Sequence, residues 1–159
     1  MTRSICAALA LSLLMSATPS IAKPRTPPAT PAGPNFLARN GKARLVVTTP
    51  SGLEYFVVKS GPLKGQHPRA GDTVTFDYEV KLLTGETIDS SFDRGEPLTG
   101  GVGDFVPGFT EALKRMRPGD EWIVWVPPAL GYGAEDKGPI PGNSVLRFRL
   151  VLRSIAPAS

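Results

Sequence analysis

The sequence is poor in the side chains that most often carry covalent or metal chemistry. Its 159 residues include one cysteine, Cys6, and one histidine, His67. Cys6 lies in an N-terminal apolar run, so we expect no disulfide and no thiol nucleophile in the folded part of the chain. His67 lies in the glycine- and proline-rich segment GQHPRAG, which is typical of a solvated loop. We therefore expect no metal centre, no Ser-His-Asp triad and no cofactor.

The chain also lacks a long run of one charge sign. Lys and Arg number 18 and Asp and Glu number 14, which gives a formal net charge of +4. This mild basic excess without a basic cluster does not indicate binding to nucleic acid. The run GGVGDF is rich in glycine, but no GxxxxGK[ST] motif follows it. It therefore predicts a loop rather than a phosphate-binding cradle.

The N-terminus has the features of a secretory signal. Arg3 precedes the apolar run ICAALALSLLMSA, and Ser20-Ile21-Ala22 supplies the small residues that a signal peptidase reads. We predict a signal peptide over residues 1–22 and a periplasmic or secreted protein with no membrane span after its removal. The alternative, a membrane anchor, is disfavoured because the run is shorter than about 18 residues. Residues 23–34, KPRTPPATPAGP, predict an extended proline-rich linker, or alternatively a ligand for a partner domain.

Four apolar residues repeat at helical spacing in the middle of the segment 103–133. They are Phe109, Ala112, Leu113 and Met116. Their spacing predicts a short helix with one apolar face. Pro107 is tolerated in a first helical turn, and Pro118-Gly119 prevents continuation. The run EWIVWV over 121–126 then predicts a strand, which Pro127-Pro128 ends.

Two further segments alternate between apolar and polar residues, which indicates strands with one buried face and one solvated face. The inward positions are Val74, Phe76, Tyr78, Val80 and Leu82 in the first segment and Leu146, Phe148, Leu150 and Leu152 in the second. Asp77 is among the residues expected to meet water. A return strand is expected over Thr87–Ser91, and Asn35 is a candidate cap for a short helix that ends before Asn40-Gly41. These patterns predict a short helix packed on an antiparallel sheet.

The strand over 121–126 places an apolar pair on the outer side of the sheet. Trp122, Val124 and Val126 are expected to face the core, which leaves Ile123 and Trp125 outside. Two interpretations are open. The N-terminal segment around Phe36 and Leu45 folds back and covers the pair, or the pair forms a docking patch for another protein.

Four segments, in this order and with this spacing, resemble the FKBP-type peptidyl-prolyl cis-trans isomerase family. They are GDTVTFDYEV, TGETIDSSFDRGEP, VPGFTEALKRMRPGDEWIVWVPPALGYG and GPIPGNSVLRFRLVLRSI. The resemblance implies an isomerase domain over residues 50–156, with an N-terminal extension over residues 35–49. It also implies an α+β fold, in which a curved antiparallel β-sheet wraps around one short α-helix. Secreted bacterial single-domain members are the nearest match.

The resemblance implies catalysis of rotation about X–Pro bonds in proline-containing polypeptides, without a covalent intermediate. Asp89 and Tyr132 match the catalytic positions, with Asp89 oriented by Tyr78 and Arg94. The Tyr132 hydroxyl and the Val106 N–H would hold the carbonyls that flank the proline. The positions implied to bind substrate are Tyr78, Ile88, Leu98, Phe105, Val106, Phe109, Ile140 and Phe148. Without the resemblance, Tyr78, Phe109 and Phe148 are better explained as core residues.

The sequence departs from the family pattern at several pocket positions. Phe109 stands where the floor usually carries Trp, Ile88 where Phe is frequent, Leu98 where an aromatic residue is common, and Leu130 where Tyr is frequent. These changes keep the pocket apolar but reduce its aromatic surface. We expect an isomerase with reduced affinity for macrolide inhibitors such as rapamycin.

An alternative function is a weakly active or inactive chaperone or protein-binding module of the same fold. The short connection AEDKGPIPGNS leaves no room for the inserted chaperone domain that some family members carry. The long dimerising helix of some secreted members is also absent, so a monomer is expected.

Overall fold

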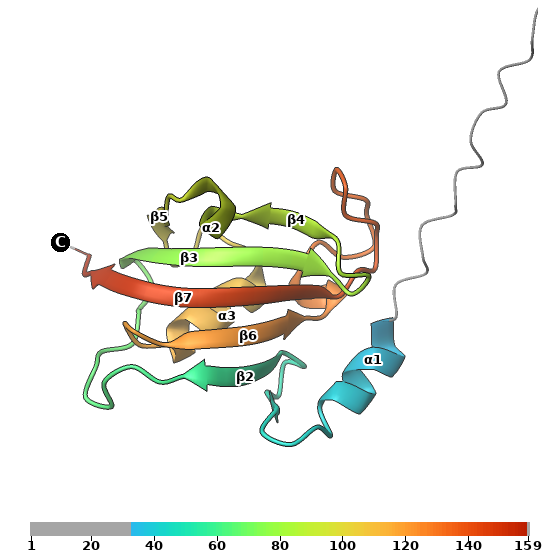
Figure 1. Ribbon diagram of the computed structural model, residues 1–159, viewed down its shortest axis with the longest axis horizontal. Helices are drawn as coiled ribbons and strands as arrows, with labels where there is room; N and C mark the ends of the chain where they lie inside the picture. The colour runs from blue at the N-terminus through green and yellow to red at the C-terminus, as the bar shows by residue number, and fades with distance from the viewer. Residues whose placement is uncertain (1–32, 159) are drawn as a thin grey trace, which may run out of the picture.

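The computed structural model describes residues 33–158 (Figure 1). The predicted signal peptide and nearly all of the predicted linker lie outside the described residues. The helices are α1 (Gly33–Asn40), α2 (Ser91–Arg94), α3 (Pro107–Arg115) and the 3-10 turn η1 (Pro128–Leu130). The strands are β1 (Val47–Thr48), β2 (Glu54–Lys59), β3 (Thr73–Leu82), β4 (Thr87–Ser90), β5 (Leu98–Gly101), β6 (Glu121–Val126) and β7 (Leu146–Ala156).

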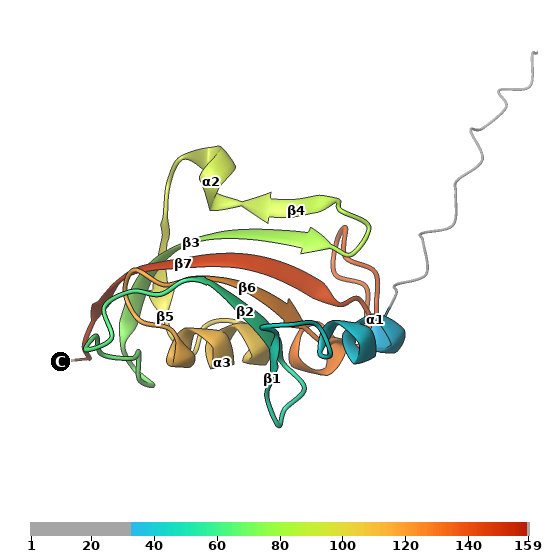
Figure 2. The ribbon, with the colours of Figure 1, turned by 60° about the horizontal axis from the view of Figure 1, so that its bottom comes forward.

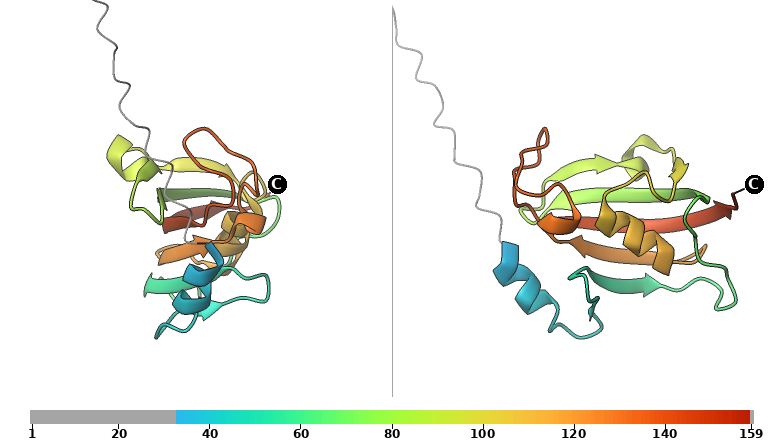
Figure 3. Two further views of the ribbon diagram at one scale, coloured as in Figure 1. Left: turned by 90° about the vertical axis from the view of Figure 1, so that its right-hand side faces the viewer. Right: turned by 180° about the vertical axis from the view of Figure 1, so that it is seen from behind.

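The strands form one antiparallel sheet in the order β1-β2-β6-β7-β3-β4, and β5 also pairs with β3. The sheet is curved, and α3 lies across its concave side, as Figures 2 and 3 show. The predicted fold class, an α+β architecture with a curved antiparallel sheet around one short helix, is confirmed.

The alternation predicted for β6 and β7 is confirmed residue by residue. Trp122, Val124 and Val126 are buried on the concave side, and their β7 partners at Leu146, Phe148 and Leu150 are buried beside them. Each fully buried apolar side chain contributes about 1.5–3 kcal/mol to the free energy of folding. The core between sheet and helix is therefore the main source of stability.

Helix α3 also has the predicted form. Phe109, Ala112, Leu113 and Met116 are all buried against the sheet. Pro107 stands in the first turn, where its missing N–H leaves no helical hydrogen bond unmade. Gly119 follows the helix with φ 92°, a left-handed conformation that glycine adopts without strain. The helix is thereby held to about two turns, and Phe109 stands at its start.

Helix α2 and strand β5 were not predicted from the sequence. The return strand β4 ends at Ser90, and α2 begins at Ser91 because the Ser90 hydroxyl accepts the Asp93 N–H at 3.2 Å. Gly95 closes α2 with φ 70°. The run GGVGDF is not wholly a loop, because its first two glycines end β5. Elements this short form because they contact β3, and the local sequence does not predict such contacts.

Asp77 does not meet water as the alternation predicted. It points to the outer side of β3, yet it is only 3% exposed. Its carboxylate accepts hydrogen bonds from the Ser91 hydroxyl at 3.4 Å and from the Arg153 side chain. Helix α2 folds over this part of the sheet, so Asp77 is buried but hydrogen-bonded, which offsets the cost of its burial.

Helix α1 begins at Gly33, two residues before the expected cap at Asn35, and includes Asn40, before which it was expected to end. Phe36 packs on Trp125 with ring centroids 6.4 Å apart, so the N-terminal segment partly covers the outer apolar pair. Leu45 does not take part, because it is 68% exposed. Asn40 also donates to the buried Glu54 at 2.7 Å, which ties the end of α1 to β2. Within the described residues, no helix has the length and apolar character to cross a bilayer.

His67 is exposed, as expected for a solvated loop histidine. Its Nδ1 nevertheless lies 3.1 Å from the Met116 carbonyl oxygen, so this loop is held to the end of α3. The interaction is consistent with a structural role for the histidine.

Candidate active site

A cavity of about 390 Å³ opens between the sheet and the start of α3. Most of its lining is apolar or aromatic, and its acidic side chains are Asp89 and Asp104. The lining residues are Phe76, Tyr78, Val80, Ile88, Asp89, Leu98, Asp104, Phe105, Val106, Phe109, Tyr132, Ile140 and Phe148. They come from β3, β4, β5, β7, α3, the loop before α3 and the loop between η1 and β7, so only the folded chain brings them together.

Aromatic rings form the floor of the cavity. Phe109 is 4% exposed, and its ring centroid lies 5.1 Å from that of Phe76, 4.9 Å from that of Phe105 and 5.2 Å from that of Phe148. The inclined geometries, between 46° and 76°, are those that aromatic pairs prefer. Each ring is therefore held in place by its neighbours, and the floor is rigid and apolar.

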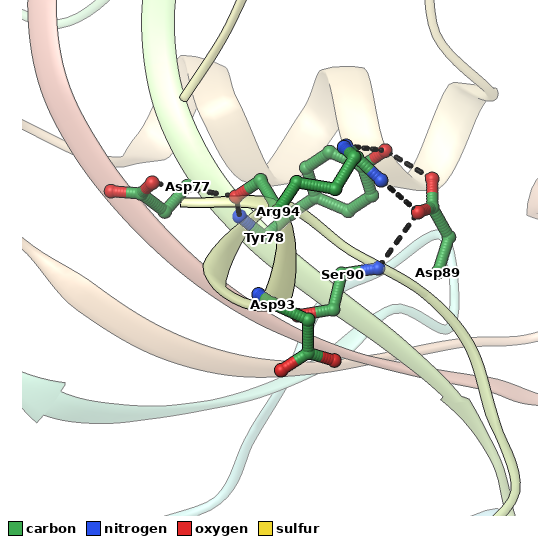
Figure 4. Close-up of polar contacts among 7 residues, drawn as sticks. Asp77, Tyr78, Asp89, Ser90, Asp93 and Arg94 are labelled. Carbon is green, nitrogen blue, oxygen red and sulfur yellow. Dashed lines mark hydrogen bonds and ion pairs between the residues drawn. The ribbon is translucent and has the colours of Figure 1, made fainter. Parts of the chain in front are cut away.

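The side chains of Tyr78, Asp89 and Arg94 converge, as Figure 4 shows, and the first two line the cavity. The Tyr78 hydroxyl donates a hydrogen bond to Asp89 and accepts one from Arg94 at 3.0 Å. Arg94 also forms an ion pair with Asp89, and its guanidinium carbon lies 5.5 Å from the centre of the Tyr78 ring. Asp89 further accepts the Ser90 N–H at 2.8 Å. These contacts hold Asp89 ionised and oriented at the rim.

The electrostatics follow from these contacts. The Tyr78 hydrogen bond lowers the pKa of Asp89 below its usual 3.8, and the contacts with Arg94 and Ser90 add to this effect against the opposing influence of burial. Burial and the carboxylate raise the pKa of Tyr78 above 10.0. At neutral pH Asp89 is therefore an anion and Tyr78 a neutral hydrogen-bond donor.

Buried contacts on the outer side of the sheet fix α2, and with it Arg94. Ser91 is fully buried, and its hydroxyl accepts the Tyr78 backbone N–H at 2.9 Å while it donates to Asp77. Arg153 closes the group by its ion pair with Asp77. Helix α2 is thus attached to β3 directly behind Tyr78, which places Arg94 over the Tyr78 ring (Figure 4).

The loop after η1 supplies another part of the cavity lining. Tyr132 lines the cavity and is 41% exposed, whereas Ile140 is buried. The loop is closed by two backbone hydrogen bonds, from Asn143 to Gly133 at 2.8 Å and from Lys137 to Ile140 at 2.8 Å. Among the described residues, no backbone carbonyl accepts the Val106 N–H. Tyr132 and Val106 both line the cavity.

The structure brings all of the catalytic and substrate-binding residues expected from the sequence to this one cavity. Sequence reasoning missed Phe76, Val80 and Asp104. The first two share the inward face of β3 with Tyr78, so the alternation could have found them, whereas Asp104 gave no signal. Leu130, expected at a pocket position, does not line the cavity and instead lies close to Gly108. The roles of these residues in binding and catalysis remain predictions.

The arrangement suits a reaction without a nucleophile. A ring-lined hollow of this size can bury a small apolar side chain, and its polar lining consists of two carboxylates and two phenols, from Asp89, Asp104, Tyr78 and Tyr132. Such a site can bind a peptide segment and change the environment of its amide groups.

The chain is similar to proteins of one known family. The family model for FKBP-type peptidyl-prolyl cis-trans isomerases matches residues 64–153. The chain is 40% identical over 121 residues to the peptidyl-prolyl cis-trans isomerase Mip of Coxiella burnetii, covering 76% of this chain and 52% of that protein. It is 39% identical over 128 residues to the outer membrane protein MIP of Legionella longbeachae, covering 80% and 54% respectively.

A solved structure shows the same fold. The crystal structure of FkpA from Escherichia coli superposes with a TM-score of 0.74 at 37% identity, over 79% of this chain and 58% of that one. The chain spans about half the length of the curated relatives that it matches. The matched family model, the identities and the shared fold show that this chain belongs to the FKBP-type peptidyl-prolyl cis-trans isomerase family.

Proposed function

We propose that this protein is a peptidyl-prolyl cis-trans isomerase that accelerates X–Pro bond rotation in secreted or periplasmic polypeptides. The observation that carries the proposal is the aromatic cavity with Asp89 and Tyr132 at its rim, in a chain of this family. The cavity takes the proline side chain, and the polypeptide remains bound without a covalent bond to the enzyme.

The physical basis is the electronic structure of the amide. Resonance gives the planar peptide bond a rotation barrier of roughly 18–20 kcal/mol, and the twisted transition state loses that resonance together with its charge separation. An apolar site destabilises the polar planar amide relative to the twisted form. Each 1.4 kcal/mol or so of that difference accelerates rotation about tenfold.

The polar groups at the rim have distinct roles in this proposal. Asp89, held ionised by Tyr78 and Arg94, acts on the carbonyl that rotates. The Tyr132 hydroxyl and the Val106 N–H hold the carbonyls on either side of the proline, so that only the X–Pro bond turns. This positioning converts binding energy into control of one torsion angle.

Two further proposals concern the cellular setting and the inhibitors. One matched relative is named an outer membrane protein, which supports export of this chain to the cell envelope by the predicted signal at residues 1–22. Because Phe109, Ile88 and Leu98 offer less aromatic surface than the larger rings common at these positions, we propose that macrolides such as rapamycin bind weakly.

A protease-coupled assay with a short proline peptide tests the proposed activity. The purified protein is compared with an Asp89→Ala, Tyr132→Phe double variant and with a control that carries Asp93→Ala and Tyr55→Phe. The control changes the same residue types outside the cavity lining. We expect the rim variant to lose at least about tenfold in kcat/KM and the control to keep the wild-type value. Equal activity of wild type and rim variant would refute the proposal.

A further inference from the structure

The wall of the cavity formed by β5 has a feature that the proposed roles do not use. Leu98 and Gly100 lie opposite Phe76 and Val74 of β3 in the sheet register. Residues directly opposite each other in an antiparallel pair point to the same side. Since Phe76 and Val74 are buried on the concave side, a side chain at position 100 would point into the concave side as well.

Phe105 occupies the space that such a side chain would need. A Cβ atom built on Gly100 would lie 2.9 Å from Cζ of Phe105, closer than real Cβ contacts. The ring meets the backbone of β5 end-on, with its other nearest atoms at 3.7 and 3.8 Å from the same point. No positive φ demands glycine at this position, so the requirement is for space and not for backbone conformation.

The Phe105 ring has little freedom to move elsewhere within the core. Phe76 stands against it at 5.3 Å between centroids in an edge-to-face contact, and Phe109 lies at 4.9 Å. Both of these neighbouring rings are buried. The open side of Phe105 is the cavity that it lines. A ring displaced from Gly100 would therefore turn into the cavity.

We infer that Gly100 is a positioning residue that keeps the cavity open, because the Phe105 ring packs against β5 in the space that a side chain at position 100 would fill. This inference rests on the proposed isomerase activity, because it assigns Phe105 a place in the wall that the bound proline contacts. Because Gly100 has no side chain, the ring of Phe105 packs against β5 and supplies the apolar surface that β5 lacks at this position.

A double-mutant cycle tests this coupling. The proteins are wild type, Gly100→Ala, Phe105→Leu and the double variant, with Gly103→Ala as the matched control. Gly103 lies in the turn that follows β5, and a Cβ there would meet nothing within 4 Å. We expect Gly100→Ala to lower kcat/KM about fivefold to tenfold, as crowding in a packed site does. In a protein that already carries Phe105→Leu, the same change is expected to cost less than about twofold, because the flexible leucine side chain yields. Gly103→Ala should keep the wild-type value.

Equal effects of Gly100→Ala in the presence and absence of Phe105→Leu would overturn the inference, as would wild-type activity of Gly100→Ala. Two measurements do not depend on activity. A nuclear Overhauser contact is expected between Hζ of Phe105 and the Hα protons of Gly100, and its absence would refute the packing of the Phe105 ring on Gly100. Thermal unfolding should show the same coupling, with Gly100→Ala lowering the midpoint by roughly 4 °C only when Phe105 is present. If the wild type is inactive but both results hold, the proposed function fails and the Gly100–Phe105 packing stands.

Discussion

Replacement of Phe109 by leucine should separate the stability of the fold from the activity of the site. Phe109 is buried, and it contacts the rings of Phe76, Phe105 and Phe148 at about 5 Å. Leucine fills much of the same volume but makes no aromatic contacts. At about 0.5 kcal/mol for each lost ring contact, the free energy of unfolding should fall by about 1.5 kcal/mol. This is a tolerable loss for a domain stable by about 5–15 kcal/mol.

Phe109→Leu should affect kcat/KM more strongly than it affects the fraction of folded protein. In the proposed function the Phe109 ring is the surface on which the proline rests. A loss of about 50 Å² of apolar contact is worth about 1.2 kcal/mol at 25 cal/mol/Å². The expected fall in kcat/KM is therefore close to tenfold.

Leu113→Ala provides the matched comparison on the same helix. Leu113 is fully buried one turn farther along α3, but it does not line the cavity. Its truncation should cost about 3 kcal/mol, because it leaves a closed void in the core. Its effect on kcat/KM, corrected for the folded fraction, should be less than about twofold. Urea unfolding and the peptide assay measure both quantities. The reasoning is refuted if Leu113→Ala loses as much activity per folded molecule as Phe109→Leu, or if Phe109→Leu keeps wild-type kcat/KM.

Three other results are expected. Tyr78→Phe removes the hydrogen bond that contributes most to lowering the pKa of Asp89, so an NMR titration should find this pKa higher than in the wild type, and an unchanged value would contradict the network. The depressed pKa of Asp89 implies that its contribution to stability is complete above about pH 3.8 and is lost as the pH falls below that value, which thermal unfolding of wild type and Asp89→Asn between pH 2 and 7 would show. Phe36→Ala removes the ring that packs on Trp125, so the amides of α1 should exchange faster while kcat/KM stays unchanged, and a loss of activity would mean that α1 influences the cavity.

Much of this fold could be predicted because its main elements carry their own pattern. The apolar spacing from Phe109 to Met116 and the alternation in β6 and β7 each follow from local geometry. The proline and glycine residues before and after the apolar face of α3 are also local signals, because they indicate where the helix begins and ends. The candidate site residues that surround the cavity were identified from the family resemblance. Without the resemblance, Tyr78 and Phe109 would have been interpreted as core residues.

Other features depend on segments that are far apart in the chain. Asp77 has the sequence position of a solvated residue, and only the folding of α2 over β3 buries it with Ser91 and Arg153. Likewise, the cover over Trp125 comes from Phe36 and not from Leu45, because the path of the chain between α1 and β1 decides which side chain arrives there.

The amino-acid sequence by itself therefore determined the main strands, the central helix and the apolar character of the site, because hydrophobic periodicity and turn residues act over a few neighbouring positions. Only the tertiary structure decided that Gly100 accommodates the ring of Phe105 and that Tyr78, Asp89 and Arg94 meet at the rim. Those contacts join different strands, helices and loops, and their energies depend on distances that exist only after the sheet has closed around α3.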